Sequence, residues 1–292
     1  MLAYDRAVLI FNPQSTGDAE RLATELRDEL AERLPQFPVQ LQPTQHAGHA
    51  RDLAREAAAV GSPLIVSVSG DGGYNEVVDG AMQAGNDRAV CAVLPAGNAN
   101  DHRRATKQKP LADAIVAGTI TRLDLLRLTV DGAAVPTGHA HSYIGLGLTP
   151  VVAVELEKGG KGSLKEMLTT VRAFARFRPF EIQLADGSRK RFDSIVFANI
   201  SEMAKVATLS EPDTPDDGMF EVITIEATSK WALLRTALKA ATRGLGPQPS
   251  VHEYRFTTLK PMPIQVDGEV MHLPPGAAVR VDIVPRALNT VV

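Results

Sequence analysis

The chain has 292 residues, a formal net charge of −3 and 44% hydrophobic residues. Its length suits one large or two ordinary domains, and its composition is that of a soluble globular protein. The charge gives no sign of nucleic-acid binding, and the single cysteine, Cys91, excludes a disulfide within the chain. We see no signal peptide and no apolar run long enough to span a membrane, so we expect a cytoplasmic protein with at most peripheral membrane contact.

Strands alternate with helices in the first 122 residues. Apolar runs predict strands at residues 7–11, 38–42, 63–68 and 89–94. Leucines at i, i+4 spacing predict a helix after the first strand, and further helices are expected near residues 47–60 and 74–84. This order builds a parallel sheet covered on both faces, with ligands beyond the carboxyl ends of its strands.

The third strand runs into the glycine-rich segment Ser69-Gly70-Asp71-Gly72-Gly73. The unpaired N–H groups that open the following helix, together with its dipole, suit a phosphate. An acid such as Asp71 is repelled by phosphate unless a cation such as Mg²⁺ lies between them. The alternative is a plain turn whose aspartate caps the helix.

The loops after the other three strands are also small and polar. They cover residues 12–18, 43–44 and 95–101. Each alone fits an ordinary turn, since Ser, Thr, Asn and Asp favour turns for structural reasons. Their convergence at one sheet edge favours a phosphate and metal site.

Several of these elements together resemble a known family. The chain has Asn12-Pro13 and Ser15, then Gly70-Asp71-Gly72 with Asn75-Glu76-Val77 and Gly80. It continues with Leu94-Pro95-Ala96-Gly97, Asn100-Asp101 and Arg122-Leu123-Asp124-Leu125. In order and spacing these elements resemble the diacylglycerol kinase catalytic domain of bacterial lipid kinases and sphingosine kinases.

The resemblance implies an ATP- and Mg²⁺-dependent kinase that phosphorylates a lipid hydroxyl, with the site in a cleft between two domains. The nucleotide would contact Asn12, Pro13, Gln14, Ser15, Thr16, Thr44, Ser69, Gly70, Asp71, Gly72, Gly73, Asn75, Glu76, Gly97 and Asn98. The catalytic Mg²⁺ would be placed by Asp71, Asp101 and Asp124, directly or through water.

Two positions depart from the family pattern. The family usually has Gly-Gly-Asp-Gly-Thr where this chain has residues 69–73, so the hydroxyl expected at Gly73 is missing. The family usually has Gly-Thr-x-Asn-Asp where this chain has Asn98 in place of threonine. Ser69 adds a hydroxyl one step before the turn, and the amide of Asn98 can still donate a hydrogen bond.

After residue 122 the pattern changes to strands. They are expected at residues 123–130, 141–146, 180–184, 194–198, 219–225, 252–257, 264–266 and 279–283. Many strands with few helices indicate an antiparallel sandwich. We therefore expect an α/β nucleotide-binding domain at residues 1–122, of the phosphofructokinase and NAD kinase type. A β-rich lipid-substrate domain follows at residues 123–286, and the tail at 287–292 joins the first domain.

The segment Asp267-Gly268-Glu269 lies between β-branched runs, which by itself predicts a hairpin turn. The family carries an Asp-Gly-Glu at this place, and one of its acids accepts the proton of the substrate hydroxyl. The resemblance therefore makes Asp267 or Glu269 the general base, with Asp71 as a rival.

A second metal site is implied near residue 217. The segment Asp216-Asp217-Gly218 resembles a family element that holds a structural metal in some bacterial relatives. The ligands would be Asp217, Thr214 and the backbone carbonyl of Met219, and oxygen ligands suit Mg²⁺ or Ca²⁺. A turn with solvated acids is the alternative.

Basic residues gather at 158–178 and 230–243. A basic amphipathic helix can rest on an anionic membrane, which would bring the protein to a lipid substrate, although solvated helix faces explain the same pattern. The histidines lack metal-site spacing and are expected in surface or core roles. The sequence leaves a homodimer open.

Two rival functions remain. One is a different kinase with the same Gly-Asp-Gly turn, such as an NAD kinase-like enzyme. The other is a protein that keeps the fold and binds nucleotide or lipid without efficient turnover.

Overall fold

The computed structural model describes residues 2–15, 18–96, 110–131, 138–147, 178–200, 202–203, 207–208, 217–227 and 247–291. The chain divides into two compact units. The N-terminal unit comprises Met1–Leu125, Pro215–Asp217 and Val284–Val292. The β unit comprises Leu126–Thr214 and Gly218–Ile283.

The N-terminal unit contains a four-stranded parallel sheet in the order β2-β1-β3-β4. Its strands are β1 (Arg6–Phe11), β2 (Val39–Pro43), β3 (Pro63–Ser69) and β4 (Val90–Pro95). The predicted parallel sheet is therefore confirmed. Its central strands are buried on both faces, which is why their sequences are continuous apolar runs rather than alternating ones.

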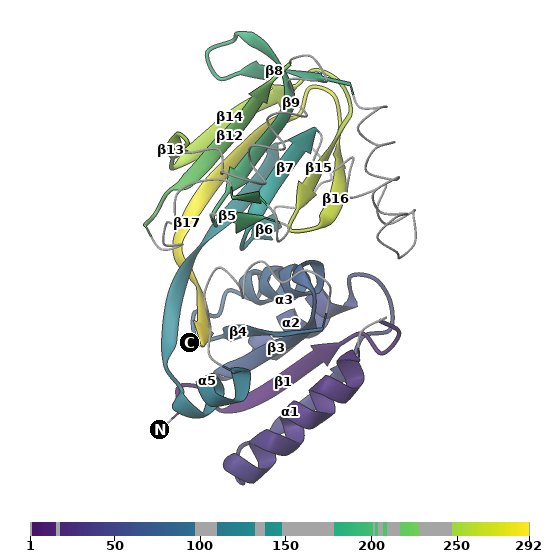
Figure 1. Cartoon of the computed structure of the whole chain (residues 1–292), viewed down its shortest axis with the longest axis vertical. Coiled ribbons are helices and arrows are strands. Elements are labelled where there is room, and N and C mark those ends of the chain that lie inside the picture. Colours follow the sequence, from purple (N-terminus) through teal and green to yellow (C-terminus); the bar gives the residue numbers. More distant parts are fainter. Residues whose placement is uncertain are drawn as a thin grey trace. The chain divides into compact units, whose positions relative to one another are not determined.

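Helices pack on both faces of this sheet (Figure 1). They are α1 (Ala19–Arg33), α2 (His49–Ala58), α3 (Asp71–Gln83) and α5 (Leu111–Ala117). One face of the sheet forms a core with α1 and α5, and the other forms a core with α2 and α3. Leu26 and Leu30 of α1 are buried, as their spacing predicts.

The start of α3 differs from the expected one. The helix begins at Asp71, so Gly72 and Gly73 belong to its first turn rather than to a turn before it. Gly70 takes the N-cap position with an extended backbone, and no side chain caps the helix. The glycine-rich segment is thus a direct passage from strand into helix.

The β unit is built on an eleven-stranded sheet, and its residues form a separate core. Its strands are β5 (Ile120–Asp131), β6 (Gly138–Ala140), β7 (Tyr143–Gly147), β8 (Phe180–Leu184), β9 (Arg189–Ala198), β12 (Phe220–Glu226), β13 (Ser250–Val251), β14 (Glu253–Thr258), β15 (Met262–Val266), β16 (Glu269–Leu273) and β17 (Ala278–Val291). Antiparallel pairs such as β7 with β9 and β9 with β12 confirm the predicted antiparallel β domain. A two-stranded sheet of β10 (Glu202–Met203) and β11 (Ala207–Thr208) is separate.

Strands β15 and β16 form a hairpin whose two-residue turn is Asp267-Gly268. Both turn residues have positive φ, 42° at Asp267 and 96° at Gly268. A type I′ turn has this combination, and Asp-Gly is one of the dipeptides that favour it. The turn predicted from this dipeptide is present.

The end of β17 packs within the N-terminal unit. Leu288 and Val291 lie in its two apolar cores. The side-chain amide of Asn289 donates hydrogen bonds to the carbonyls of Asp87 (2.7 Å) and Ala89 (3.0 Å). Among the helices described, none is long and apolar enough to span a bilayer.

Candidate functional site

Strand register brings the polar loops of the N-terminal unit to one edge of its sheet. Phe11 aligns with Pro43 on one side and with Val68 on the other, and Ser69 aligns with Pro95. All four strands therefore end at the same level, so the described residues that follow β1, β2 and β3 lie next to one another. This is the edge at which parallel α/β sheets bind their ligands.

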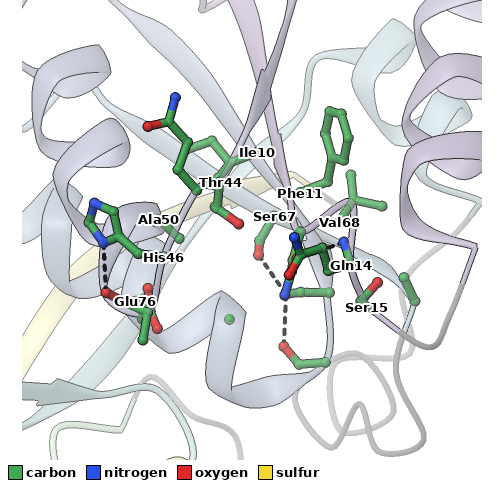
Figure 2. Close-up of a pocket in the computed structure, with 17 residues that line it drawn as sticks. Ile10, Phe11, Gln14, Ser15, Thr44, His46, Ala50, Ser67, Val68 and Glu76 are labelled. Carbon is green, nitrogen blue, oxygen red and sulfur yellow. Dashed lines mark hydrogen bonds between the residues drawn. The ribbon is translucent and has the colours of Figure 1, made fainter.

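A pocket of about 490 Å³ opens at this edge (Figure 2). It is lined by Ile10, Phe11, Asn12, Gln14, Ser15, Thr44, Gln45, His46, Ala47, Ala50, Ser67, Val68, Ser69, Gly70, Gly73, Glu76 and Ala96. Figure 2 shows His46 and Glu76 on one side of the pocket and Gln14 and Ser15 on the other. The pocket combines hydroxyl, amide and apolar groups in a volume that suits a small ligand.

Two hydrogen bonds within the loop after β1 fix its backbone. The side chain of Asn12 accepts a hydrogen bond from the backbone N–H of Gln14 (2.9 Å), and the carbonyl of Asn12 accepts one from Ser15 (3.1 Å). Such a turn fixes the backbone and leaves the side chains of Gln14 and Ser15 at the pocket wall. Asn12 thus fixes the conformation of the loop that carries Gln14 and Ser15.

The N-terminal end of α3 forms another part of the wall, through the N-cap Gly70, Gly73 of the first turn and Glu76 of the second. The N–H groups of a helix's first turn have no partners within the helix, and the helix dipole adds positive potential there. Asp71 is the first residue of this helix and is half-buried, next to the lining residue Gly70. The pocket therefore offers donors for an anion, with the carboxylate of Glu76 in its lining and that of Asp71 next to it in the chain.

The described lining contains Glu76 and His46 but neither lysine nor arginine. A polyphosphate bound here would meet hydroxyl, amide and backbone donors rather than side-chain cations among these residues. Its charge would then have to be balanced by a metal ion or by groups outside the described part of the chain.

The structure places the predicted nucleotide residues in three groups. Asn12, Gln14, Ser15, Thr44, Ser69, Gly70, Gly73 and Glu76 line the pocket. Pro13, Asp71, Gly72 and Asn75 do not line it. Asn75 is buried, and its side-chain oxygen lacks a hydrogen-bond partner among the described residues. Thr16, Gly97 and Asn98 lie outside the described residues, as does Asp101.

Sequence reasoning missed three polar residues of the lining, Gln45, His46 and Ser67. His46 was expected in a surface or core role, whereas it lies at the pocket and its ring stacks on His49 with centroids 4.7 Å apart. The signal for Ser67 was a hydroxyl inside an otherwise apolar strand. The loop after β2 continues past Thr44 before α2 begins. Gln45 and His46 could therefore have been predicted as lining residues from their place in a loop at a strand end.

Asp124, a predicted Mg²⁺ ligand, is 1% exposed. Its Oδ1 accepts a hydrogen bond of 2.6 Å from the backbone N–H of Arg286, a residue with a positive φ of 51°. The carboxylate thus stabilises a strained backbone position in β17, and its metal role stays a prediction. Across the described ranges, no cluster of three or more His, Cys, Asp or Glu side chains has metal-site geometry.

The carboxylate of Asp267 in the β unit is also buried, at 1% exposure. It accepts hydrogen bonds from the backbone N–H groups of His141 (2.6 Å), Ser142 (3.2 Å) and Tyr143 (2.8 Å). The Nε2 atom of His141 lies 3.3 Å from its Oδ2. Burial raises the pKa of Asp267 to about 7, although the three N–H groups act in the opposite direction.

Glu269, two residues further on, is an exposed residue at the start of β16. Asp217 is exposed and Met219 is half-buried, whereas Thr214 lies outside the described residues. The second metal site therefore stays a prediction, as do the membrane-binding roles of the basic stretches. Of those stretches only Arg178 is described.

Two family profiles match the chain and together span most of it. The diacylglycerol kinase catalytic domain matches residues 6–128, and the YegS C-terminal NAD kinase beta sandwich-like domain matches residues 143–292. A diacylglycerol kinase of Bacillus subtilis is 25% identical over 288 residues, which cover 93% of this chain and 92% of the relative. One from Staphylococcus saprophyticus is also 25% identical, over 93% of this chain and 91% of its own length.

A solved structure shows the same fold. The crystal structure of a diacylglycerol kinase from Bacillus anthracis superposes with a TM-score of 0.72. The superposition covers 99% of this chain and 97% of the other at 19% identity. The parallel α/β unit with its loop-lined pocket, the antiparallel β unit and the two profile matches agree, and the chain belongs to the diacylglycerol kinase catalytic-domain family of lipid kinases.

Proposed function

We propose that this protein is an ATP- and Mg²⁺-dependent kinase that transfers the γ-phosphate to a lipid hydroxyl. The observation that supports this most is the pocket of about 490 Å³ at the carboxyl ends of the parallel strands. It is lined by hydroxyl and amide side chains and by the first turn of α3. Phosphoryl transfer depends mainly on positioning and on charge stabilisation, and this lining would supply the positioning.

The nucleotide phosphates would bind against residues 69–73, where backbone N–H groups of the first turn of α3 donate hydrogen bonds. Ser15 and Thr44 would add hydroxyl donors from the loops after β1 and β2. These groups are fixed by secondary structure and by the turn at Asn12, so little reorganisation would accompany binding.

The described lining has no lysine or arginine, which supports a need for divalent metal. Mg²⁺ in kinases is commonly held by one or two carboxylates plus substrate phosphates, so a single protein carboxylate fits this role. Asp71 would hold it, directly or through water, and Asp101 would be a second candidate. When bound, the metal neutralises charge on the phosphate oxygens during transfer.

We assign proton acceptance from the lipid hydroxyl to Glu269 rather than Asp267. Both oxygens of Asp267 already accept backbone hydrogen bonds, and the residue is 1% exposed, so a substrate hydroxyl has no access to them. Glu269 is exposed and follows directly on the turn that Asp267 fixes. In this assignment Asp267 is a positioning residue.

The acceptor would be a diacylglycerol-like lipid presented at a membrane surface. Transfer of label from [γ-³²P]ATP should be measured against diacylglycerol, phosphatidylglycerol, sphingoid bases and NAD, with and without EDTA. Metal-dependent labelling of a lipid supports the proposal. Labelling of NAD alone would establish the NAD kinase-like alternative, and binding of ATP without any transfer would establish a non-catalytic protein.

A further inference from the structure

At the junction of β3 and α3, the side chain of Ser69 occupies the space that a side chain at position 73 would need. An ideal Cβ placed on Gly73 would lie 2.6 Å from Oγ and 2.7 Å from Cβ of Ser69. Cβ atoms in real proteins do not approach other atoms this closely, so position 73 accepts only glycine while Ser69 keeps its place. The serine side chain therefore occupies the site that a side chain at position 73 would otherwise fill.

The hydroxyl of Ser69 is held by two neighbours. It lies 2.6 Å from Oγ of Ser67 and donates a hydrogen bond to the carbonyl of Gly70 at 2.9 Å. In that arrangement the Ser67 hydroxyl is the donor to Ser69. Ser67 is 2% exposed, so its hydroxyl is fixed in the strand, and both serines line the pocket.

We propose that Ser69 is the phosphate-binding hydroxyl of the pocket, donated from the end of the strand into the space beside the first turn of α3. The proposal rests on the proposed function and names one specificity-determining residue within that site. Ser67 is a positioning residue that donates to Ser69 Oγ and so leaves the Ser69 proton for the ligand. On binding, this proton turns from the carbonyl of Gly70 to a phosphate oxygen.

The proposal also explains why a hydroxyl residue is not needed at position 73. A threonine there would require Ser69 to move, whereas Ser69 already supplies a hydroxyl in the same space. The two positions are therefore coupled: a hydroxyl can come from 69 or from 73, but not from both. A chain with Gly73 has kept the donor rather than lost it.

Three variants test this coupling. Ser69→Ala removes the hydroxyl, and we expect binding of Mg·ATP, measured by calorimetry, to weaken about tenfold to a hundredfold. Gly73→Thr introduces the overlap, and we expect a thermal midpoint lower by roughly 2 to 8 °C along with weaker binding. The double change Ser69→Gly with Gly73→Thr moves the hydroxyl and should recover most of both losses.

Two controls separate this effect from general damage. Ser188→Ala removes an exposed hydroxyl in the β8–β9 turn, and Gly138→Ala adds a Cβ where nothing lies within 4 Å. Both should leave binding of Mg·ATP unchanged.

Wild-type-like binding by Ser69→Ala would overturn the proposal, as would a double variant no better than Gly73→Thr. An unshifted midpoint for Gly73→Thr would disprove the steric coupling. Wild-type protein that binds no nucleotide would instead overturn the proposed function, and the phosphate contact with it.

Discussion

Two of the Asp-Gly pairs in the chain, at residues 71–72 and 267–268, place their aspartates in opposite environments. In the N-terminal unit, Asp71 opens a helix and is half-buried beside the pocket. In the β unit, Asp267 occupies a hairpin turn, is 1% exposed and has its carboxylate surrounded by three backbone N–H groups. The comparison teaches that the accessibility of the carboxylate, rather than the motif, decides whether an aspartate can act on a ligand.

The largest effect is expected at Asp71. Replacing it in Asp71→Ala should abolish ATP turnover, because Asp71 is the acidic residue in the first turn of α3 and bound phosphate would lose its metal contact. The thermal midpoint should stay close to that of the wild type. Turnover is measured by release of ADP and stability by circular dichroism.

Asp52→Ala is a matched control, because Asp52 lies in the first turn of α2 and forms an ion pair with exposed Arg55. It should retain full turnover. Comparable activity in Asp71→Ala and wild type would remove Asp71 from the mechanism. It would also disprove the claim that Asp71, unlike Asp267, acts on a ligand.

A smaller loss of activity is expected at Glu269. Glu269→Gln keeps the shape of the side chain but cannot accept a proton, so turnover should fall by about a hundredfold or more. The apparent affinity for Mg·ATP and the thermal midpoint should not change. Rates with a lipid acceptor give the first quantity, and calorimetry gives the second.

Glu226→Gln provides the comparison, since Glu226 is an exposed acid on β12 of the same unit. Full lipid phosphorylation by Glu269→Gln would return the role of general base to Asp267 or Asp71.

The third effect concerns stability and sharpens the assignment of Asp267. An aspartate in an unfolded chain ionises near pH 3.8, whereas burial raises the pKa of Asp267 to about 7 in the folded protein. Between these values the folded state holds a proton that the unfolded state has lost. The free energy of unfolding should therefore fall as pH rises, by about 1.4 kcal/mol per pH unit from this group alone.

Urea unfolding of wild type and Asp267→Asn between pH 5 and pH 8 measures this slope. The asparagine variant lacks the titrating group, so its stability relative to wild type should rise with pH up to about 7. Parallel pH profiles for the two proteins would show that Asp267 is ionised throughout this range.

Much of this organisation follows from the sequence. Period and composition were sufficient for the parallel strands, because strands buried on both faces are unbroken apolar runs, and for the leucine face of α1. The start of α3 was placed three residues late, since Gly72 and Gly73 have low helix propensity and tertiary packing overrides it. The short helix α5 was not predicted at all.

Within the site, the loops at the strand ends could be predicted and the contacts between side chains could not. The overlap between Ser69 and a Cβ at position 73 depends on the angle at which α3 leaves β3. The partners of Asp267 lie 124 to 126 residues earlier in the chain, so sequence alone left Asp267 and Glu269 equivalent. In the structure they differ in exposure, because Asp267 is buried and Glu269 is exposed.

The most direct test is a crystal structure of the protein with Mg²⁺ and a non-hydrolysable ATP analogue. We predict phosphate oxygens within hydrogen-bond distance of Ser69 Oγ and of the backbone N–H groups that open α3, with the metal on Asp71. A nucleotide bound elsewhere, or a pocket left empty at saturating analogue, would contradict the account.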